Sequence, residues 1–194
     1  MLNSHNSMTH DIEQACAVLQ AGGIILYPTD TVWGLGCDAT QPEAVARIYA
    51  LKRRKDSQAL IVLVPDIAAL QQYIEQLPPN IAALLAAITR PTTIVYPNVQ
   101  GVAHNLKAPD GSVAIRLPQH DFCQALLRQY GKPIVSTSAN LSGEWPPNDF
   151  RDLNPAIIAG SQWVAPQHYE NSYNSPPSTI LRITVNGTAE VIRA

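Results

Sequence analysis

The sequence predicts a single α/β domain with a twisted, mixed sheet flanked by helices. Apolar runs of strand length alternate with helical stripes through the first two-thirds of the chain. Strand-like runs then follow one another closely, which indicates local pairing. Because 194 residues suffice for one core, we expect one domain over 1–194, with residues 1–10 flexible.

In the first third of the chain, acids, glycines and prolines mark the expected elements. Asp11 precedes an apolar stripe, which predicts a helix that ends at Gly22-Gly23. The apolar run 24–27 then predicts a buried strand. Pro42 is at a typical first helical position, and the stripe after it predicts a helix to Lys52.

The middle third continues this alternation. The continuous apolar run 60–64 is typical of a strand covered on both faces. Short helices are expected over 67–74 and 81–88, each after a proline. The β-branched runs 92–96 and 113–117 predict two further strands.

One more helix is expected over 122–130, capped by Asp121 and stopped at Gly131. A short buried strand, 133–135, should follow it and lead into a Ser/Thr-rich turn.

The last third carries a hairpin signal and two irregular segments. Asn186-Gly187 between the alternating runs 179–184 and 189–193 predicts the hairpin. The segments 143–148 and 167–177 are rich in Pro, Asn and Ser and are expected to be mobile loops, the second a candidate lid.

Composition excludes several classes of protein. The net charge is −2, so the chain as a whole is not a polyanion binder. No apolar run approaches the roughly 20 residues of a membrane span, and the N-terminal residues lack a signal-peptide pattern, so we expect a cytoplasmic protein. Cys16, Cys37 and Cys123 form no CxxC pair, which predicts buried packing residues and no metal site.

The most informative stretch, YPTDTVWGLG, runs from Tyr27 to Gly36 and follows the first expected strand. Ligands bind in open α/β sheets where strands end, and glycines let the backbone approach a ligand closely. Taken alone, the stretch fits a binding loop and a tight turn with polar filler equally well.

Two further segments have the character of an anion site. The basic run Lys52-Arg53-Arg54-Lys55 stands at a helix end. One or two cations there interact favourably with the helix dipole, but that effect does not require four. The run STSANLSG, which starts at Ser136, offers small hydroxyls and backbone N–H groups past a strand end. An ordinary Ser/Thr-rich turn is the alternative for the second segment.

Arg116 is a charged residue inside the apolar strand 113–117. An unpaired buried guanidinium is costly, so its side chain must meet solvent, an acid or a ligand anion. The sequence contains no GxxxxGK[ST], GxGxxG or GxSxG, so P-loop, Rossmann and serine-hydrolase interpretations are excluded.

Together these segments resemble the YrdC-domain family of threonylcarbamoyl-adenylate synthases, in its short, single-domain form. The resemblance runs from about Ile12 to Arg193. It is carried by five segments in the family's order: YPTDTVWGLG at 27–36, Lys52-Arg53-Arg54 with Leu60-Ile61-Val62, VAIRLP at 113–118, Ser138-Ala139-Asn140, and Pro177-Ser178-Thr179-Ile180.

The resemblance implies a YrdC-like open α/β fold and a reaction. Threonine and bicarbonate give N-carboxythreonine, whose carbamate oxygen attacks the α-phosphate of ATP to yield threonylcarbamoyl-AMP and pyrophosphate. Mg²⁺ is expected to accompany ATP. Downstream tRNA-modification proteins are then the expected partners, for N6-threonylcarbamoyladenosine synthesis.

The same resemblance implies site residues. Lys52 and Arg54 would be catalytic and would hold the nucleotide phosphates. The threonine pocket and the remaining nucleotide contacts are implied for two sets of residues: Thr31, Arg116, Ser136, Ser178 and Thr179 for threonine, and Ser138, Asn140 and Arg193 for the nucleotide. A histidine that the family often carries after the Leu-Ile-Val strand is Leu63 here.

A second function class stays open on the sequence alone. The basic run 52–55 with Arg90 and Arg116 fits a module that binds tRNA or double-stranded RNA by shape, without catalysis. A ligand-sensing regulatory domain is a third interpretation.

Overall fold

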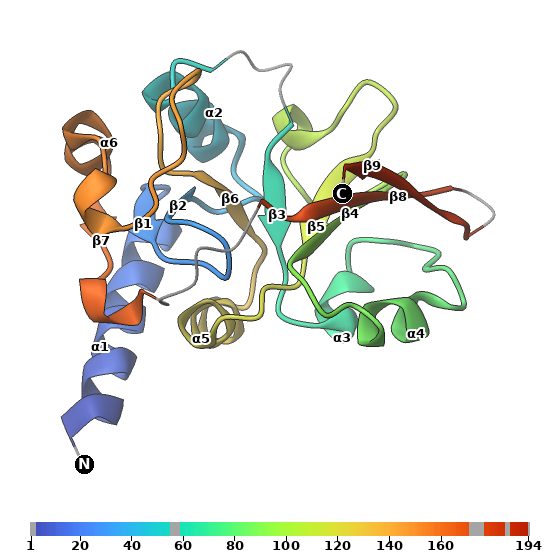
Figure 1. The fold of residues 1–194 in the computed structure, drawn as a ribbon, viewed down its shortest axis with the longest axis horizontal. Helices are drawn as coiled ribbons and strands as arrows, with labels where there is room; N and C mark the ends of the chain where they lie inside the picture. The colour runs from blue at the N-terminus through green and yellow to red at the C-terminus, as the bar shows by residue number, and fades with distance from the viewer. Residues whose placement is uncertain (1–2, 55–58, 171–176, 185–186, 194) are drawn as a thin grey trace.

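The computed structural model describes residues 3–54, 59–170, 177–184 and 187–193. They form one twisted nine-stranded sheet in the order β7-β1-β2-β6-β3-β5-β4-β8-β9 (Figure 1). Its strands are β1 (Ile25–Tyr27), β2 (Gly34–Gly36), β3 (Ile61–Leu63), β4 (Thr92–Tyr96), β5 (Val113–Arg116), β6 (Ile134–Ser138), β7 (Trp163–Val164), β8 (Thr179–Ile183) and β9 (Ala189–Arg193).

Six α-helices and three short 3₁₀ helices accompany the sheet in the described residues. They are α1 (Asn3–Gln20), α2 (Pro42–Leu51), α3 (Ile67–Leu70), α4 (Ile81–Ala86), α5 (Asp121–Tyr130), α6 (Pro155–Gly160), η1 (His104–Leu106), η2 (Phe150–Asp152) and η3 (Gln167–Tyr169). Figure 1 shows α1, α6 and β7 at one end of the sheet and the β8–β9 hairpin at the other.

The sheet is mixed, as the sequence predicts. β1 with β7, β3 with β5 and β4 with β8 are parallel pairs, whereas the other neighbours run antiparallel. The predicted hairpin is confirmed by the antiparallel β8–β9 pair, although Asn186 of its turn lies outside the described residues.

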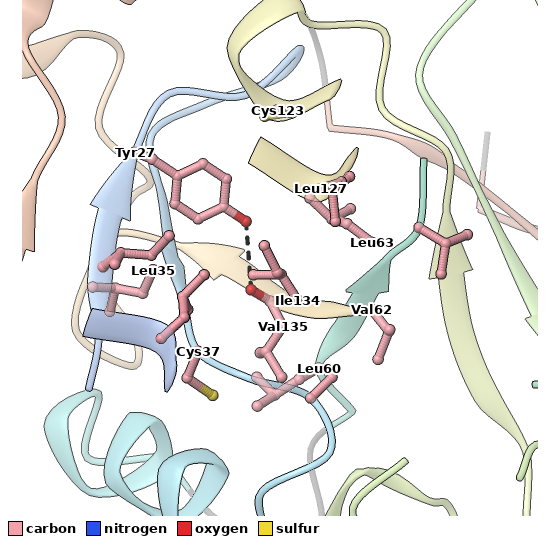
Figure 2. Close-up of a cluster of buried hydrophobic side chains, with 14 of the residues drawn as sticks. Tyr27, Leu35, Cys37, Leu60, Val62, Leu63, Cys123, Leu127, Ile134 and Val135 are labelled. Atoms are coloured by element: carbon pink, nitrogen blue, oxygen red, sulfur yellow. Dashed lines mark hydrogen bonds between the residues drawn. The ribbon is translucent and has the colours of Figure 1, made fainter. Parts of the chain in front are cut away.

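The core is centred on the strands that surround Tyr27. Figure 2 shows its ring among aliphatic side chains from β3, α5 and β6, with its hydroxyl donating to the carbonyl oxygen of Val135 at 3.4 Å. All three cysteines are buried, and burial raises the pKa of the Cys37 and Cys123 thiols. The predicted packing role of these cysteines is confirmed, because buried protonated thiols are poor nucleophiles.

Several element boundaries differ from the prediction. The first helix begins at Asn3, not at Asp11, so residues 3–10, expected to be flexible, are helical. This helix packs against α5, and ahead of Asp11 the partly buried side chain of Met8 packs against the core. Helix α3 ends at Leu70 because the following amides of Gln72 and Tyr73 bond three residues back, a tightening typical of a helix end.

Helix α5 starts one residue earlier than predicted and is capped by a different side chain. The imidazole Nδ1 of His120 accepts from the backbone N–H of Cys123 at 3.4 Å, in place of a cap at Asp121. The predicted stop is confirmed, since Gly131 takes a left-handed conformation with φ 72°.

Parts of the two segments with a candidate binding role are strands. Gly34–Gly36 forms β2 between β1 and β6, and residues 136–138 complete β6. A Cβ on Gly36 would lie 2.6 Å from Cε1 of Tyr27 and 2.8 Å from the carbonyl oxygen of Val135. Gly36 is therefore needed for strand packing, and the backbone of residues 136–138 pairs within the sheet, whereas residues 139–143 follow the end of β6.

Candidate active site

Several of the predicted site residues lie on strands of the one sheet. Ser136 and Ser138 are on β6, Arg116 on β5, Thr179 on β8 and Arg193 on β9. Strand register places Arg116 opposite Leu63 on one side and Thr93 on the other. The sheet thus brings residues from Arg116 to Arg193 into one row of strands.

The stretch before β2 is held together by one hydroxyl. Thr29 Oγ1 donates to the carbonyl oxygen of Val32 at 2.7 Å and accepts from the backbone N–H of Thr31 at 3.1 Å. It also lies 3.0 Å from Oγ1 of Thr31. This side-chain-to-backbone turn fixes where Thr31 points.

Arg116 reaches the same stretch from β5. Its Nη1 donates to Thr31 Oγ1 at 3.3 Å, and its Nη2 lies 3.3 Å from Oδ1 of Asp30. The guanidinium and the carboxylate side chains are only 4% and 5% exposed. Of the three partners that the sequence leaves open for Arg116, the structure shows an acid.

A buried pair of hydroxyls, one on the neighbouring strand β4 and one just before β8, lies near Arg116. Thr93 Oγ1 and Ser178 Oγ are 2.9 Å apart, and Thr93 is the β4 residue opposite Arg116. The guanidinium of Arg193 donates to the carbonyl oxygen of Ser178 through Nε at 3.3 Å and Nη2 at 2.7 Å. Ser178 is therefore held through both its hydroxyl and its carbonyl oxygen, whereas Thr179 donates its backbone N–H to the carbonyl oxygen of Pro91.

Lys52 lies deeper than a helix-end cation at the surface. Only 1% of the residue is exposed, and its Nζ donates to the carbonyl oxygens of Ser138 and Asn140, the latter at 2.7 Å. Burial, followed by the neighbouring Arg54, lowers the pKa of this ammonium to about 8. Lys52 thus fastens the end of α2 to the end of β6.

Arg54 and Asn140 lie beside this lysine. The guanidinium of Arg54 donates to the carbonyl oxygen of Ala59 at 2.8 Å and to Thr137 Oγ1 at 3.5 Å, and burial lowers its pKa. The amide nitrogen of Asn140 donates to the carbonyl oxygens of Leu141 and Glu144. Within the described residues, Nε of Arg54 and Oδ1 of Asn140 are buried without a hydrogen-bond partner.

Ser136 and Ser138 lie on β6, next to the glycine-containing strand β2. Ser138 is opposite Gly34, and a Cβ on Gly34 would lie 3.2 Å from Oγ of Ser136. Ser136 is buried, and Ser138 is half-buried. The absence of a side chain at Gly34 therefore lets Ser136 approach β2 closely.

The segment predicted as a lid is partly anchored. Residues 167–169 form η3, where the hydroxyl of Tyr169 donates to Asp11 Oδ2 at 2.8 Å. Oε1 of Glu170 accepts from Trp33 Nε1 at 2.8 Å and from the backbone N–H of Phe150 at 2.9 Å. Residues 171–176 lie outside the described residues, so the lid stays a prediction.

Sequence reasoning missed three of the supporting contacts. Thr93 is one β-branched residue of a strand, and Glu170 stands in a polar loop, so neither carries a signal of its own. Asp30 is visible as an acid between two threonines, but its partner in the sequence is 86 positions away. Only the requirement that a buried Arg116 finds a counter-ion pointed to such a pair.

The side chains that could ligate a metal ion bear on the expected Mg²⁺. Among the described residues, no group of three His, Cys, Asp or Glu side chains is placed to hold an ion. Phosphate oxygens are preferred Mg²⁺ ligands, so the residues fit an ion that arrives with ATP and not a dedicated protein cage. A cavity of about 390 Å³ between residues 74–79, the end of β4 and the β8–β9 hairpin includes none of the predicted site residues in its lining.

Comparison with known proteins identifies the family of this chain. A family model for Sua5, YciO and YrdC proteins, described as telomere recombination, matches residues 17–194. The chain belongs to this family. The predicted resemblance is thereby confirmed.

Named relatives of the family agree with that result. A threonylcarbamoyl-AMP synthase of Xanthomonas campestris pv. campestris is 37% identical over 154 residues, which cover 78% of this chain and 82% of that protein. A threonylcarbamoyl-AMP synthase of Xanthomonas oryzae pv. oryzae is 36% identical over 157 residues, covering 78% of this chain and 84% of that protein.

Solved structures show the same fold. The Sua5 of P. abyssi, solved with L-threonine, superposes with a TM-score of 0.84 at 24% identity over 94% of this chain, which spans 53% of that Sua5 chain. The E. coli YciO structure superposes with a TM-score of 0.80 at 23% identity, covering 94% of this chain and 87% of that one. The predicted α/β fold is confirmed. None of the helices in the described part of the chain is long and apolar enough to cross a bilayer.

Proposed function

We propose that this Sua5/YciO/YrdC protein is a threonylcarbamoyl-AMP synthase, which forms threonylcarbamoyl-AMP and pyrophosphate from ATP, L-threonine and bicarbonate. One observation carries the proposal. Arg116 on β5 lies beside the hydroxyl residues Thr31 and Thr93, and the cationic pair Lys52 and Arg54, which follows α2, contacts the end of β6 in the same sheet. The named relatives above support the same reaction.

The first group suits a small amino acid. A guanidinium matches a carboxylate in a planar, bidentate geometry, so Arg116 is proposed to bind the threonine carboxylate. Thr31, Ser136 and Ser178 would line the pocket with hydroxyls. Thr179 keeps a place in the proposal through its position at the start of β8.

The second group suits the phosphates. Lys52 has three N–H donors and two carbonyl acceptors in the described residues, which leaves one donor for a phosphate oxygen. Arg54 has a buried Nε without a partner there, and an anion would satisfy it. Ser138, Asn140 and Arg193 are proposed as the remaining nucleotide contacts.

Chemistry at this site needs positioning more than covalent help. A carbamate oxygen of N-carboxythreonine forms a bond to the α-phosphorus, and the bond from that phosphorus to the bridging oxygen of pyrophosphate breaks. Lys52 and Arg54 would stabilise the charge that develops on the leaving pyrophosphate. Mg²⁺ bound to ATP would supply further charge neutralisation when present.

A direct assay tests the proposed function. Folded protein is incubated with ATP, L-threonine, bicarbonate and Mg²⁺, and pyrophosphate is measured with and without threonine. We expect pyrophosphate release that depends on threonine, together with a threonylcarbamoyl-AMP product detected by mass spectrometry. No threonine-dependent release from folded protein would contradict the proposal.

The RNA-binding alternative loses its main support. Lys52 and Arg116 are 1% and 4% exposed, so the basic residues that motivated it do not form a surface stripe. Arg53 and Arg90 are exposed, and Lys55 lies outside the described residues. Contact with tRNA and with downstream tRNA-modification proteins stays a proposal that follows from the product.

A further inference from the structure

Asp30 is the acidic residue of the stretch before β2. Its carboxylate is buried beside the Arg116 side chain. Oδ1 of Asp30 lies 3.3 Å from Nη2 of Arg116, and Oδ2 accepts from the backbone N–H of Gln119 at 3.2 Å. Gln119 follows β5 in the chain. One carboxylate therefore contacts both the Arg116 side chain and the backbone just beyond its strand.

The two ends of the guanidinium are held by consecutive residues. Asp30 pairs with Nη2, and Thr31 Oγ1 accepts from Nη1 at 3.3 Å. Both residues belong to the short turn that Thr29 Oγ1 organises through the backbone N–H of Thr31 and of Val32. The turn therefore holds the guanidinium through one hydrogen bond and one ion-pair contact, and Nε of Arg116 has no hydrogen-bond partner in the described residues.

Burial makes each side chain of this pair depend on the other as its charge partner. The Arg116 and Asp30 side chains are 4% and 5% exposed, so water cannot replace a lost partner for either charge. A long arginine side chain without a counter-ion would sample other rotamers or draw in other acceptors. A carboxylate ligand that needs two parallel N–H groups would then meet the guanidinium in the wrong orientation.

We propose that Asp30 is a positioning residue for threonine recognition, which orients the Arg116 guanidinium toward the substrate carboxylate without touching the substrate. This inference rests on the proposed function, because Arg116 is taken as the carboxylate-binding group. It assigns to the acid of the YPTDTV stretch a role in selecting threonine, separate from ATP binding.

Steady-state kinetics of Asp30→Asn tests the inference. We expect the KM for threonine to rise about tenfold or more, while the KM for ATP changes by less than about twofold. Asp30→Glu keeps the charge and should recover most of the threonine affinity. Asp149→Asn, which breaks an exposed Asp–Arg pair with Arg151, is the matched control and should leave both KM values unchanged.

A double-mutant cycle shows whether Asp30 acts through Arg116. Arg116→Gln removes the guanidinium and, with it, the buried charge that Asp30→Asn would leave unpaired. Threonine binding to Arg116→Gln and to Arg116→Gln/Asp30→Asn is measured by calorimetry, and we expect equal affinities. The double variant also retains the test if Asp30→Asn alone does not fold.

The outcomes separate this inference from the proposed function. If wild-type protein neither binds threonine nor releases pyrophosphate, the proposed function fails. If wild-type protein is active and Asp30→Asn keeps a wild-type KM for threonine, or raises both KM values equally, the positioning role of Asp30 is wrong. A further loss of threonine affinity in the double variant would also contradict it, because Asp30 would then act independently of Arg116.

Discussion

At the scale of single residues, the charged groups of this site are buried, and burial decides how they behave. Lys52 is the clearest case, since its ammonium donates to two carbonyl oxygens at the end of β6. The same group is proposed to contact a phosphate. A substitution at Lys52 therefore affects the link between α2 and β6 as well as nucleotide binding, and loss of activity alone would not separate the two.

The pH dependence of Lys52 does separate them. Burial lowers the pKa of Lys52 to about 8, below the unfolded value of 10.5, so the charged form is disfavoured by folding. This group's contribution to stability should rise as pH increases from about 8 toward 10.5, while ATP affinity falls over the same range as the cation is lost. Calorimetric ATP titrations and urea unfolding between pH 7 and 10, with Lys52→Met as the control, check both directions.

Stability and ATP affinity that fall together with rising pH would contradict this account of Lys52. Lys52→Met should show neither trend at this site, because it has no titrating group there.

Arg54 and its neighbour Arg53 form a matched pair. Arg54→Ala removes a half-buried cation beside β6 and should lower pyrophosphate release by about 10²-fold or more. Arg53 is exposed and has φ 51°, a conformation that asparagine tolerates, so Arg53→Asn removes the same charge without strain. Turnover with threonine, ATP and bicarbonate measures both, and equal losses would remove the anion-site interpretation of this run.

At the scale of elements, the glycines of β2 show why a loop signal was in fact a strand. Gly34 and Gly36 are opposite Ser138 and Ile25, and their missing side chains let β6 and Tyr27 approach closely. From the sequence, such glycines are indistinguishable from those of a ligand-binding loop, because both uses need a bare backbone. The three-dimensional neighbours decide between them.

This difference predicts unequal costs for two glycine substitutions. Gly36→Ala places a Cβ 2.6 Å from the Tyr27 ring and should lower the free energy of unfolding by about 2–3 kcal/mol. A Cβ at Gly131 would meet nothing within 4 Å. Gly131→Ala should therefore lower the free energy of unfolding only through the strain of its positive φ, by about 1 kcal/mol. Urea denaturation of both variants checks the order, and a Gly131→Ala loss as large as that of Gly36→Ala would contradict it.

Some helix boundaries could be predicted from the sequence, and others could not. The start of α2 at Pro42 and the stop of α5 at Gly131 were predicted correctly, because each depends on a residue whose backbone geometry is restricted or permissive. The start of α1 at Asn3 and the His120 cap depend on packing and on a side-chain rotamer. Neither property can be read from local composition.

At the scale of the whole molecule, one buried acid links residues 38–41 to residues 130–132. Asp38 is fully buried and accepts hydrogen bonds from Thr40, Gln41 and Tyr130, with Lys132 3.3 Å away. Burial alone would raise its pKa, but the hydrogen bonds from Thr40 and Tyr130 outweigh burial and lower the pKa below 3.8. The acid thus contributes stability in its charged form.

Acid unfolding should report this contribution. The stability supplied by Asp38 is present above its unfolded pKa, about 3.9, and is lost as pH falls through the lower folded value. Urea midpoints of wild-type protein should fall steeply below pH 4, and those of Asp38→Asn should start lower at neutral pH and fall less. Parallel curves for the two proteins would show that the Asp38 hydrogen bonds do not hold its charged form.

The fold class and the family could be predicted because they follow from local patterns and ordered motifs, whereas the roles of the site residues stay predictions. Arg116 illustrates the limit: its burial in a strand requires an anion, but the choice of Asp30 depends on a turn 86 positions earlier meeting β5 in space. Lys52 illustrates another limit, because its carbonyl partners are backbone atoms that no side-chain pattern reveals.

The location of Arg116 on β5 has a consequence for dynamics. β5 is enclosed by β3 and β4, and the carbonyl oxygen of Arg116 accepts from the backbone N–H of Val64 at 3.2 Å. Local opening of an interior strand requires disruption of its neighbours, so its amides should exchange with deuterium only when the whole molecule unfolds. The group proposed to recognise the amino acid would then stand on one of the slowest-exchanging parts of the protein.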